Sequence, residues 1–66
     1  MKLQVDPAAD AAYLRFLDTP VVESEEVAPG IILDFDAGGA VVGVEVLGLA
    51  SRGHILTEVD VTPAAA

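Results

Sequence analysis

The stretch DPAADAAYLRF, residues 6–16, contains the residue types in this chain that are best suited to chemistry. Asp6 and Asp10 lie four positions apart, and paired carboxylates act as acid and base when burial separates their pKa values. Asp6 precedes a proline, however, and an aspartate in that position usually accepts hydrogen bonds from the backbone of a turn. We therefore expect both aspartates to stabilise a turn, and we identify no catalytic residue in the pair.

Tyr13 and Arg15 are two positions apart, so they share a face if this segment is a strand. A cross-strand carboxylate such as Glu45 would then form a sheet-surface ion pair with Arg15. The functional alternative is a weak anion-binding or enzymatic site around Tyr13 and Arg15, a reading that rests on a single short motif.

The stretch DFDAGGAVVGVE, residues 34–45, resembles a calcium-binding loop in the spacing of Asp34, Asp36 and Glu45. Gly38 stands where such a loop needs an oxygen ligand. An EF-hand loop also requires a helix on each side, and both flanks here alternate as strands do. The sequence therefore predicts no metal site and no cofactor.

His54 is the single histidine, and Ser24 and Ser51 are the only serines. A histidine general base needs a nucleophile and an orienting partner within hydrogen-bond reach. Neither serine lies in a nucleophile-elbow context. The sequence thus predicts a protein that is not an enzyme.

The chain is strongly acidic, with a net charge of −8 and only three basic residues. This charge disfavours nucleic acid, whose phosphates need Lys and Arg. Acidity of this kind usually serves solubility. If the run of Glu23, Glu25 and Glu26 has a specific role, we expect it to contact a basic protein partner. Together with Tyr13 and Arg15, these glutamates are the candidate protein-interaction residues.

The length of 66 residues allows one domain with a small core. Chains of this size usually need disulfides, a metal or a partner subunit, and cysteine is absent. Much of the apolar content is Ala and Val, which bury little area each. We therefore expect a homodimer or higher homo-oligomer. No apolar run reaches the length of a membrane span and no signal peptide is apparent, so we expect no membrane association and a cytoplasmic location.

The elements that must position these residues are predicted from alternation of polar and apolar residues. Strands are expected over Lys2–Val5, Ala11–Leu17, Val21–Ala28, Ile31–Asp36, Ala40–Leu47 and Ile55–Val61. Ala11–Leu17 also has a helix-forming composition, and a helix is the alternative there. Residues 48–52 suggest a short helical turn that stops at Gly53. The domain is expected to cover residues 1–62, with a disordered tail at 63–66.

The predicted fold is mainly β, with a minor α contribution: a small antiparallel sheet of five or six strands. An open sheet needs its apolar face covered, and one helical turn is too small for that. We expect a second copy to cover the face. The residues expected there are Leu14, Phe16, Leu33, Phe35, Val42, Val44 and Val46.

These segments resemble a small prokaryotic family, domain of unknown function 2283. The resemblance rests on the opening DPAADAAY, the block EVAPGIILDFD at residues 26–36, the block VVGVEVL at residues 41–47, and Ala50, Ser51 and Arg52. It covers roughly residues 1–52. It implies a small β-rich domain without an established activity, and it supplies no catalytic residue.

Two functional hypotheses follow. The first is a non-enzymatic oligomeric scaffold or protein-binding module whose acidic rim contacts other proteins. The second is an acidic antitoxin-like inhibitor of a basic partner protein.

Overall fold

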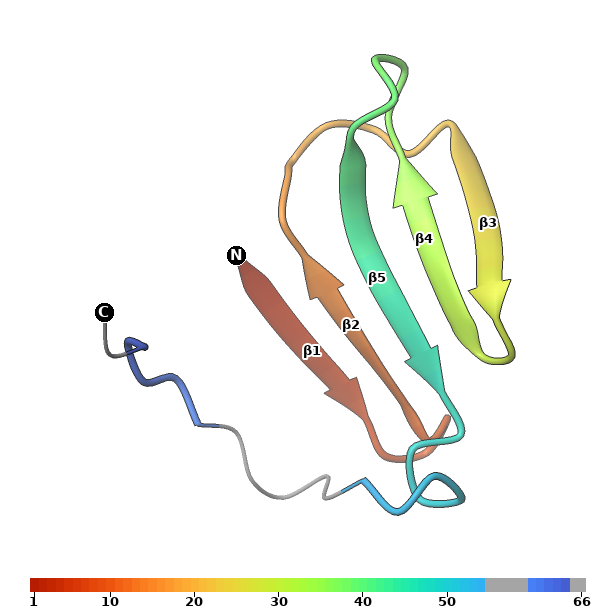
Figure 1. Cartoon of the computed structure of the whole chain (residues 1–66), viewed down its shortest axis with the longest axis vertical. Helices are drawn as coiled ribbons and strands as arrows, with labels where there is room; N and C mark the ends of the chain where they lie inside the picture. Colours follow the sequence, from red (N-terminus) through yellow and green to blue (C-terminus); the bar gives the residue numbers. More distant parts are fainter. Residues whose placement is uncertain (55–59, 65–66) are drawn as a thin grey trace.

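The computed structural model describes residues 1–54 and 60–64 of the chain, and five strands between residues 2 and 47 form one antiparallel sheet (Figure 1). The strands are β1 (Lys2–Asp6), β2 (Ala11–Arg15), β3 (Glu23–Ala28), β4 (Ile31–Phe35) and β5 (Val41–Leu47). The mainly-β prediction is confirmed. The alternative of a helix over Ala11–Leu17 is wrong, because Tyr13 and its neighbours pair with strands on both sides.

The order of the strands across the sheet is β1-β2-β5-β4-β3. β1 and β2 form a hairpin, and residues 16–22 then cross the end of the sheet to place β3 at the far edge (Figure 1). From there the chain returns through β4 to β5, which lies in the centre between β2 and β4. Strands β2 to β5 therefore form a Greek key, with β1 and β3 as the two edges.

The register divides the side chains into a polar face and an apolar face. Directly paired residues share a face, so one row across all five strands is Gln4, Tyr13, Glu45, Ile32 and Glu26. The adjacent row on the other face is Leu3, Leu14, Val44, Leu33 and Glu25. We call these two sides the polar face and the apolar face below.

The apolar face has no layer packed over it among the described residues. Among the described residues, Val42 of this face and Leu49 in the turn after β5 are the only buried apolar side chains, at 0% and 5% exposure. The other large apolar residues of the face are half-buried, apart from Leu3 and Phe16, which are 44% and 39% exposed. The fold is thus a single layer whose apolar side faces outward.

The short helical turn expected at residues 48–52 is not assigned as helix, and the minor α content that it implied is absent from the described residues. Residues 49–53 form consecutive hydrogen-bonded turns instead. Gly48 has a φ of 67°, which breaks the right-handed path at the start of the segment. The N–H of Leu49 donates to the carbonyl of Asp10 at 3.1 Å, so the segment is tied to the first hairpin. The strand expected over Ile55–Val61 lies largely outside the described residues, and residues 60 and 61 are not in a strand.

Candidate functional site

A hydrogen-bonded cluster joins three strands on the polar face. Tyr13 on β2 donates its hydroxyl proton to Oδ2 of Asp34 at 2.7 Å. Ser24 on β3 donates its hydroxyl proton to Oδ1 of the same carboxylate at 2.6 Å. The strand order explains this geometry, because β5 lies between β2 and β4 and the Tyr13 side chain must cross it. Both oxygens of Asp34 are therefore engaged inside the sheet.

Gly43 on β5 makes this crossing possible. A Cβ on Gly43 would lie 2.6 Å from Cζ of Tyr13 and 2.8 Å from the carbonyl oxygen of Leu14, which is closer than real Cβ contacts allow. Glycine inside a strand commonly marks a close approach of other groups. The phenol of Tyr13 thus occupies the space that a side chain at position 43 would fill.

The surroundings of Tyr13 raise the pKa of its phenol above 10.0. Burial contributes most, and the hydrogen bond to Asp34 and the charge of that carboxylate contribute next. Glu45, which lies opposite Tyr13 in the register, acts in the same direction, while Arg15 lowers the pKa. Tyr13 is therefore held as a neutral hydrogen-bond donor, and its environment does not favour a phenolate.

Arg15 does not share an acceptor with Tyr13. Its Nε donates to the carbonyl of Leu17 at 2.7 Å, and its Nη2 donates to the carbonyl of Thr19 at 3.2 Å. Gly43 lies opposite Arg15 in β5, so the expected cross-strand partner Glu45 faces Tyr13 instead. Arg15 thus organises the crossing loop, and the proposed ion pair with Glu45 is not formed.

Asp36 organises the turn between β4 and β5 where the sequence resembled a calcium loop. Its Oδ1 accepts the N–H groups of Gly38 and Ala40, both at 3.0 Å. Its Oδ2 accepts the Thr19 hydroxyl at 2.9 Å. These bonds, first that from Ala40 and then that from Thr19, hold the pKa of the Asp36 carboxyl below its usual value. No group of three metal-ligating side chains is found among the described residues.

Asp6 and Asp10 serve the fold as expected, but Asp10 does so in a way that the sequence analysis missed. Oδ1 of Asp6 accepts the N–H groups of Ala8 and Ala9 at 3.1 and 3.2 Å, which closes the first hairpin. Asp10 has a φ of 53°, and both of its carboxylate oxygens accept the N–H of Ala50, at 2.9 and 3.2 Å. An aspartate tolerates this left-handed conformation better than most residues.

Arg52 is a second structural residue that the sequence analysis did not single out. Its Nε donates to the carbonyl of Leu47 at 2.9 Å, and its Nη2 donates to the carbonyl of Pro29. Arg52 thereby connects the end of β5 to the turn between β3 and β4. Ser51 and Ser24 donate their hydroxyl protons to Gly48 and Asp34 respectively, and no hydrogen bond joins either serine to His54 within the described part of the chain.

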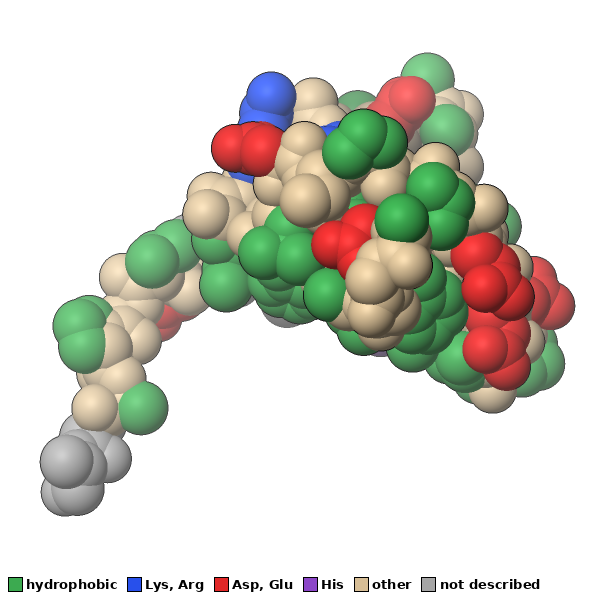
Figure 2. All heavy atoms as spheres, turned by 90° about the horizontal axis from the view of Figure 1, so that it is seen from above, with side chains coloured by type: hydrophobic (Ala, Val, Ile, Leu, Met, Phe, Trp, Pro, Cys, Tyr) green, Lys and Arg blue, Asp and Glu red, His purple; other side chains and the backbone are tan. Residues whose placement is uncertain are grey.

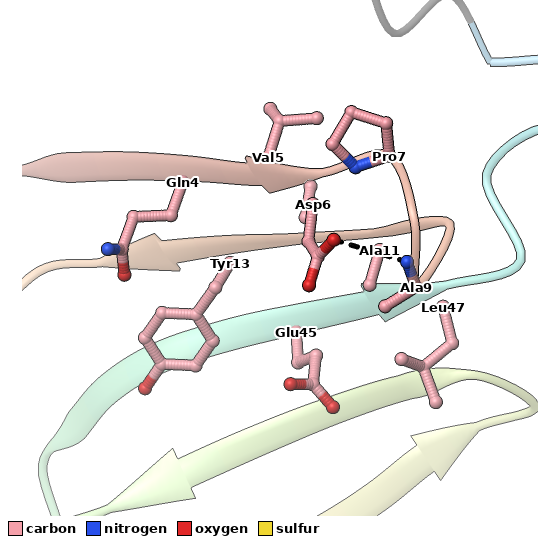
Figure 3. A pocket seen from close by; sticks show the side chains of 10 residues that line it. Gln4, Val5, Asp6, Pro7, Ala9, Ala11, Tyr13, Glu45 and Leu47 are labelled. Carbon is pink, nitrogen blue, oxygen red and sulfur yellow. Dashed lines mark hydrogen bonds between the residues drawn. The ribbon is translucent and has the colours of Figure 1, made fainter.

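An open hollow of about 540 Å³ lies on the polar face beside Tyr13 (Figure 3). Gln4, Asp6, Tyr13, Glu45 and Leu47 project into it from β1, β2 and β5, while Val5 points to the other side of the sheet. Two carboxylates, an amide and a phenol can contact a cationic or hydroxyl-bearing group. They do not supply a nucleophile with an adjacent base.

The three candidate glutamates lie on the edge strand β3, where all of the residues are exposed. Glu26 belongs to the polar face with Ile32, and Glu25 belongs to the apolar face with Leu33. Seen along the strands, acidic side chains gather on the β3 side of the sheet, and hydrophobic side chains gather beneath its curve (Figure 2). A register shift between Glu26 and Ala28 also bends this edge. Charges and bulges of this kind discourage pairing of an edge with another strand.

Comparison with known proteins identifies a family. The family model described as a protein of unknown function, DUF2283, matches residues 2–49, which cover the whole sheet. No curated protein and no solved structure matches the chain. No helix of the described residues is long and apolar enough to cross a membrane.

Proposed function

The chain belongs to the DUF2283 family, and from this premise we propose that it is a non-enzymatic, homo-oligomeric scaffold or protein-binding module. Two copies pack their apolar faces together, and their polar faces and acidic β3 edges remain on the outside. The single observation that supports this proposal is the apolar face itself, which spans the sheet and has no covering layer among the described residues.

The occupant of the apolar face is inferred to be a second copy because a chain of 66 residues usually needs disulfides, a metal or a partner subunit to be stable. Cysteine is absent, and no group of three metal-ligating side chains is found among the described residues. A partner subunit that covers the apolar face is therefore the stabiliser we infer.

The outward surfaces determine what such an oligomer would bind. The glutamates of β3 give it an acidic margin, and the hollow beside Tyr13 adds Asp6 and Glu45. Complementary charge increases the association rate and selects partners. We therefore infer a basic protein as the external partner, which is also the property that an antitoxin-like inhibitor would need. No observation on the site favours that more specific role.

Two neighbouring residues of β4 provide a matched test. Leu33 lies on the apolar face and Ile32 on the polar face, and both are half-buried. L33Q and I32Q remove similar apolar surface from the folded chain, but only L33Q alters the proposed interface. We expect L33Q to weaken self-association about 30-fold, the effect of losing a central contact worth about 2 kcal/mol, and I32Q to leave it nearly unchanged. Sedimentation equilibrium would measure both, and equal effects of the two variants would refute packing through this face.

A further inference from the structure

The two edges of the sheet differ in how well they are protected. The β3 edge has three glutamates and a register shift, which are common devices against unwanted pairing. The β1 edge has five residues, KLQVD, in continuous register with β2. β1 contains no proline and no bulge, and it carries one charge of each sign. This edge is therefore a template on which another strand can pair.

The backbone groups on the open side of β1 belong to Leu3 and Val5. Phe16 donates its N–H to the carbonyl of Val42 at 2.7 Å, and Asp10 accepts the N–H of Leu49. The even-numbered residues of β2 therefore direct their backbone groups toward β5, and the odd-numbered ones direct theirs toward β1. The odd residues Ala11, Tyr13 and Arg15 lie opposite Asp6, Gln4 and Lys2. The backbone groups of Leu3 and Val5 consequently point away from the sheet.

We propose that β1 pairs in antiparallel fashion with β1 of a second copy, about a two-fold axis at Gln4, so that Lys2 of each chain lies opposite Asp6 of the other. In this register Leu3 and Val5 of the two copies form the hydrogen-bonded pairs, using the backbone groups that point outward. Lys2 and Asp6 then form the non-hydrogen-bonded pairs, in which side chains approach most closely. The apolar faces of the two sheets also become continuous.

Charge complementarity supports this register over its neighbours. An axis at Leu3 would place Lys2 opposite Gln4, and an axis at Val5 would place Leu3 opposite Pro7, which has no N–H. Only the register at Gln4 pairs both charges of β1 with opposite charges.

Within a single chain, Lys2 lies opposite Arg15, and like charges in that position are unfavourable. An Asp6 from a second copy on the open side of β1 offsets this repulsion. Oδ1 of Asp6 is used by the first turn, while Oδ2 accepts no hydrogen bond within the described residues and is available to Lys2.

The described residues closest to this edge leave it accessible. Asp60, Val61 and Thr62 line a hollow with Met1, Leu3 and Leu14, but no backbone hydrogen bond joins residues 60–64 to β1. This contact uses a different surface from the apolar face, and the two proposals therefore stand or fall separately.

Amide hydrogen exchange tests the proposal in the unmodified protein. The amides of Leu3 and Val5 should exchange rapidly in dilute solution. At a total chain concentration about 100 times the dissociation constant, about 7% of the chains remain monomeric, so these amides should be protected about 15-fold. Exchange that stays fast at all concentrations, or protection that does not change with concentration, would overturn the proposal.

Charge-swapped variants test the register. K2E should weaken the contact at least about tenfold, since it replaces attraction by repulsion at both ends of the pair. D6K should do the same. A mixture of K2E and D6K restores opposite charges at both ends of the pair, and it should form heterodimers within about threefold of the wild-type affinity. Native mass spectrometry of the mixture would count them.

A matched control separates this effect from net charge. E26K has the same net charge as D6K but alters the β3 edge, so in K2E mixed with E26K one end of the pair stays repulsive, and heterodimers through β1 should be weaker than those of K2E with D6K. Equal heterodimer formation in the two mixtures would overturn the register. If D6K fails to fold because its turn is lost, amide exchange at Leu3 and Val5 is compared instead between the wild-type chain and K2E over a range of concentrations.

The variant L33Q distinguishes the edge contact from the face contact. Because L33Q alters only the apolar face, the concentration-dependent protection of the Leu3 and Val5 amides should persist in it.

Discussion

The phenol of Tyr13 lies over the bare Cα of Gly43, and this contact carries the tyrosine hydroxyl across the central strand to Asp34. A tyrosine on β2 thereby reaches a carboxylate on β4 although β5 separates the two strands. The polar face is held together at this point by a hydrogen-bond network, whereas the apolar face has no layer packed over it among the described residues.

Substitution of Gly43 should displace Tyr13. G43A places a Cβ against the ring and against the carbonyl oxygen of Leu14, and overpacking of this kind costs about 1–3 kcal/mol. Urea unfolding at a fixed chain concentration would measure the loss. G38A is the matched control, because a Cβ there meets Asp36 at 3.5 Å, an ordinary contact. If G43A proved as stable as G38A, the close approach of Tyr13 would not be the reason for glycine at position 43.

The Tyr13 hydroxyl should stabilise the fold at neutral pH and lose that effect in alkali. Because the folded-state pKa of Tyr13 is raised, the native chain holds its proton more tightly than the unfolded chain does. The stabilisation is therefore complete below the unfolded pKa near 10 and decreases as pH rises through the folded value. D34N should lower the Tyr13 pKa in an ultraviolet titration of the phenol. A pKa that is unchanged in D34N would contradict the assigned contact.

Removal of the Tyr13 hydroxyl alone gives a separate estimate of how much its hydrogen bond to Asp34 stabilises the fold. Y13F should cost about 0.5–1.5 kcal/mol, the usual net value of one hydrogen bond. S24A should cost less than Y13F, because Ser24 is exposed and water can replace its hydroxyl. Urea unfolding of both variants at one chain concentration measures the two losses of stability. A larger loss in S24A than in Y13F would show that the bond from Ser24 on β3, and not the bond from Tyr13 on β2, contributes more to stability.

The Asp36 carboxyl should titrate below the ordinary value of 3.8. Since its folded-state pKa is depressed, its contribution to stability is present above the unfolded pKa and is lost as pH falls through the folded value. T19A removes the hydroxyl that bonds Oδ2 and should raise the Asp36 pKa in an NMR titration of the carboxyl carbon. T62A, in the C-terminal segment, is the control and should leave it unchanged.

Asp10 should matter more for the fold than its exposed carboxylate suggests. D10A loses both the tolerance for a φ of 53° and the acceptor of the Ala50 N–H, and it should cost about 2 kcal/mol in urea unfolding. D10N keeps the left-handed preference and one acceptor oxygen, so it should cost less than about 1 kcal/mol. Equal losses in the two variants would show that neither the backbone conformation nor the acceptor explains the role of Asp10.

The sequence predicted the strands well because their signals are local. Alternation around Val42, Val44 and Val46, and the Pro29-Gly30 turn, depend on neighbouring residues only, and the strands at 31–35 and 41–47 lie within a residue of their expected ends. The prediction of a helical turn at 48–52 was not confirmed, for the opposite reason. Its backbone is directed by Asp10, which lies far away in the sequence, and local propensity does not include that contact.

The site could be predicted only in part because it depends on the order of the strands. Arg15 was expected to pair with Glu45, but that expectation required a register that only the long crossing loop determines. The contact between Tyr13 and Asp34 likewise needs β5 between β2 and β4. One sequence signal did point to it: Gly43 interrupts a run of valines, and a glycine in such a strand commonly marks a close approach.

The most direct test of the proposed oligomer is an isotope-filtered NOE measurement on a mixture of labelled and unlabelled chains. The account predicts NOEs between chains from the methyl groups of Leu14, Leu33 and Val44, because these side chains meet across the interface. A spectrum without such NOEs, from a sample that sediments as a monomer at micromolar concentration, would contradict it.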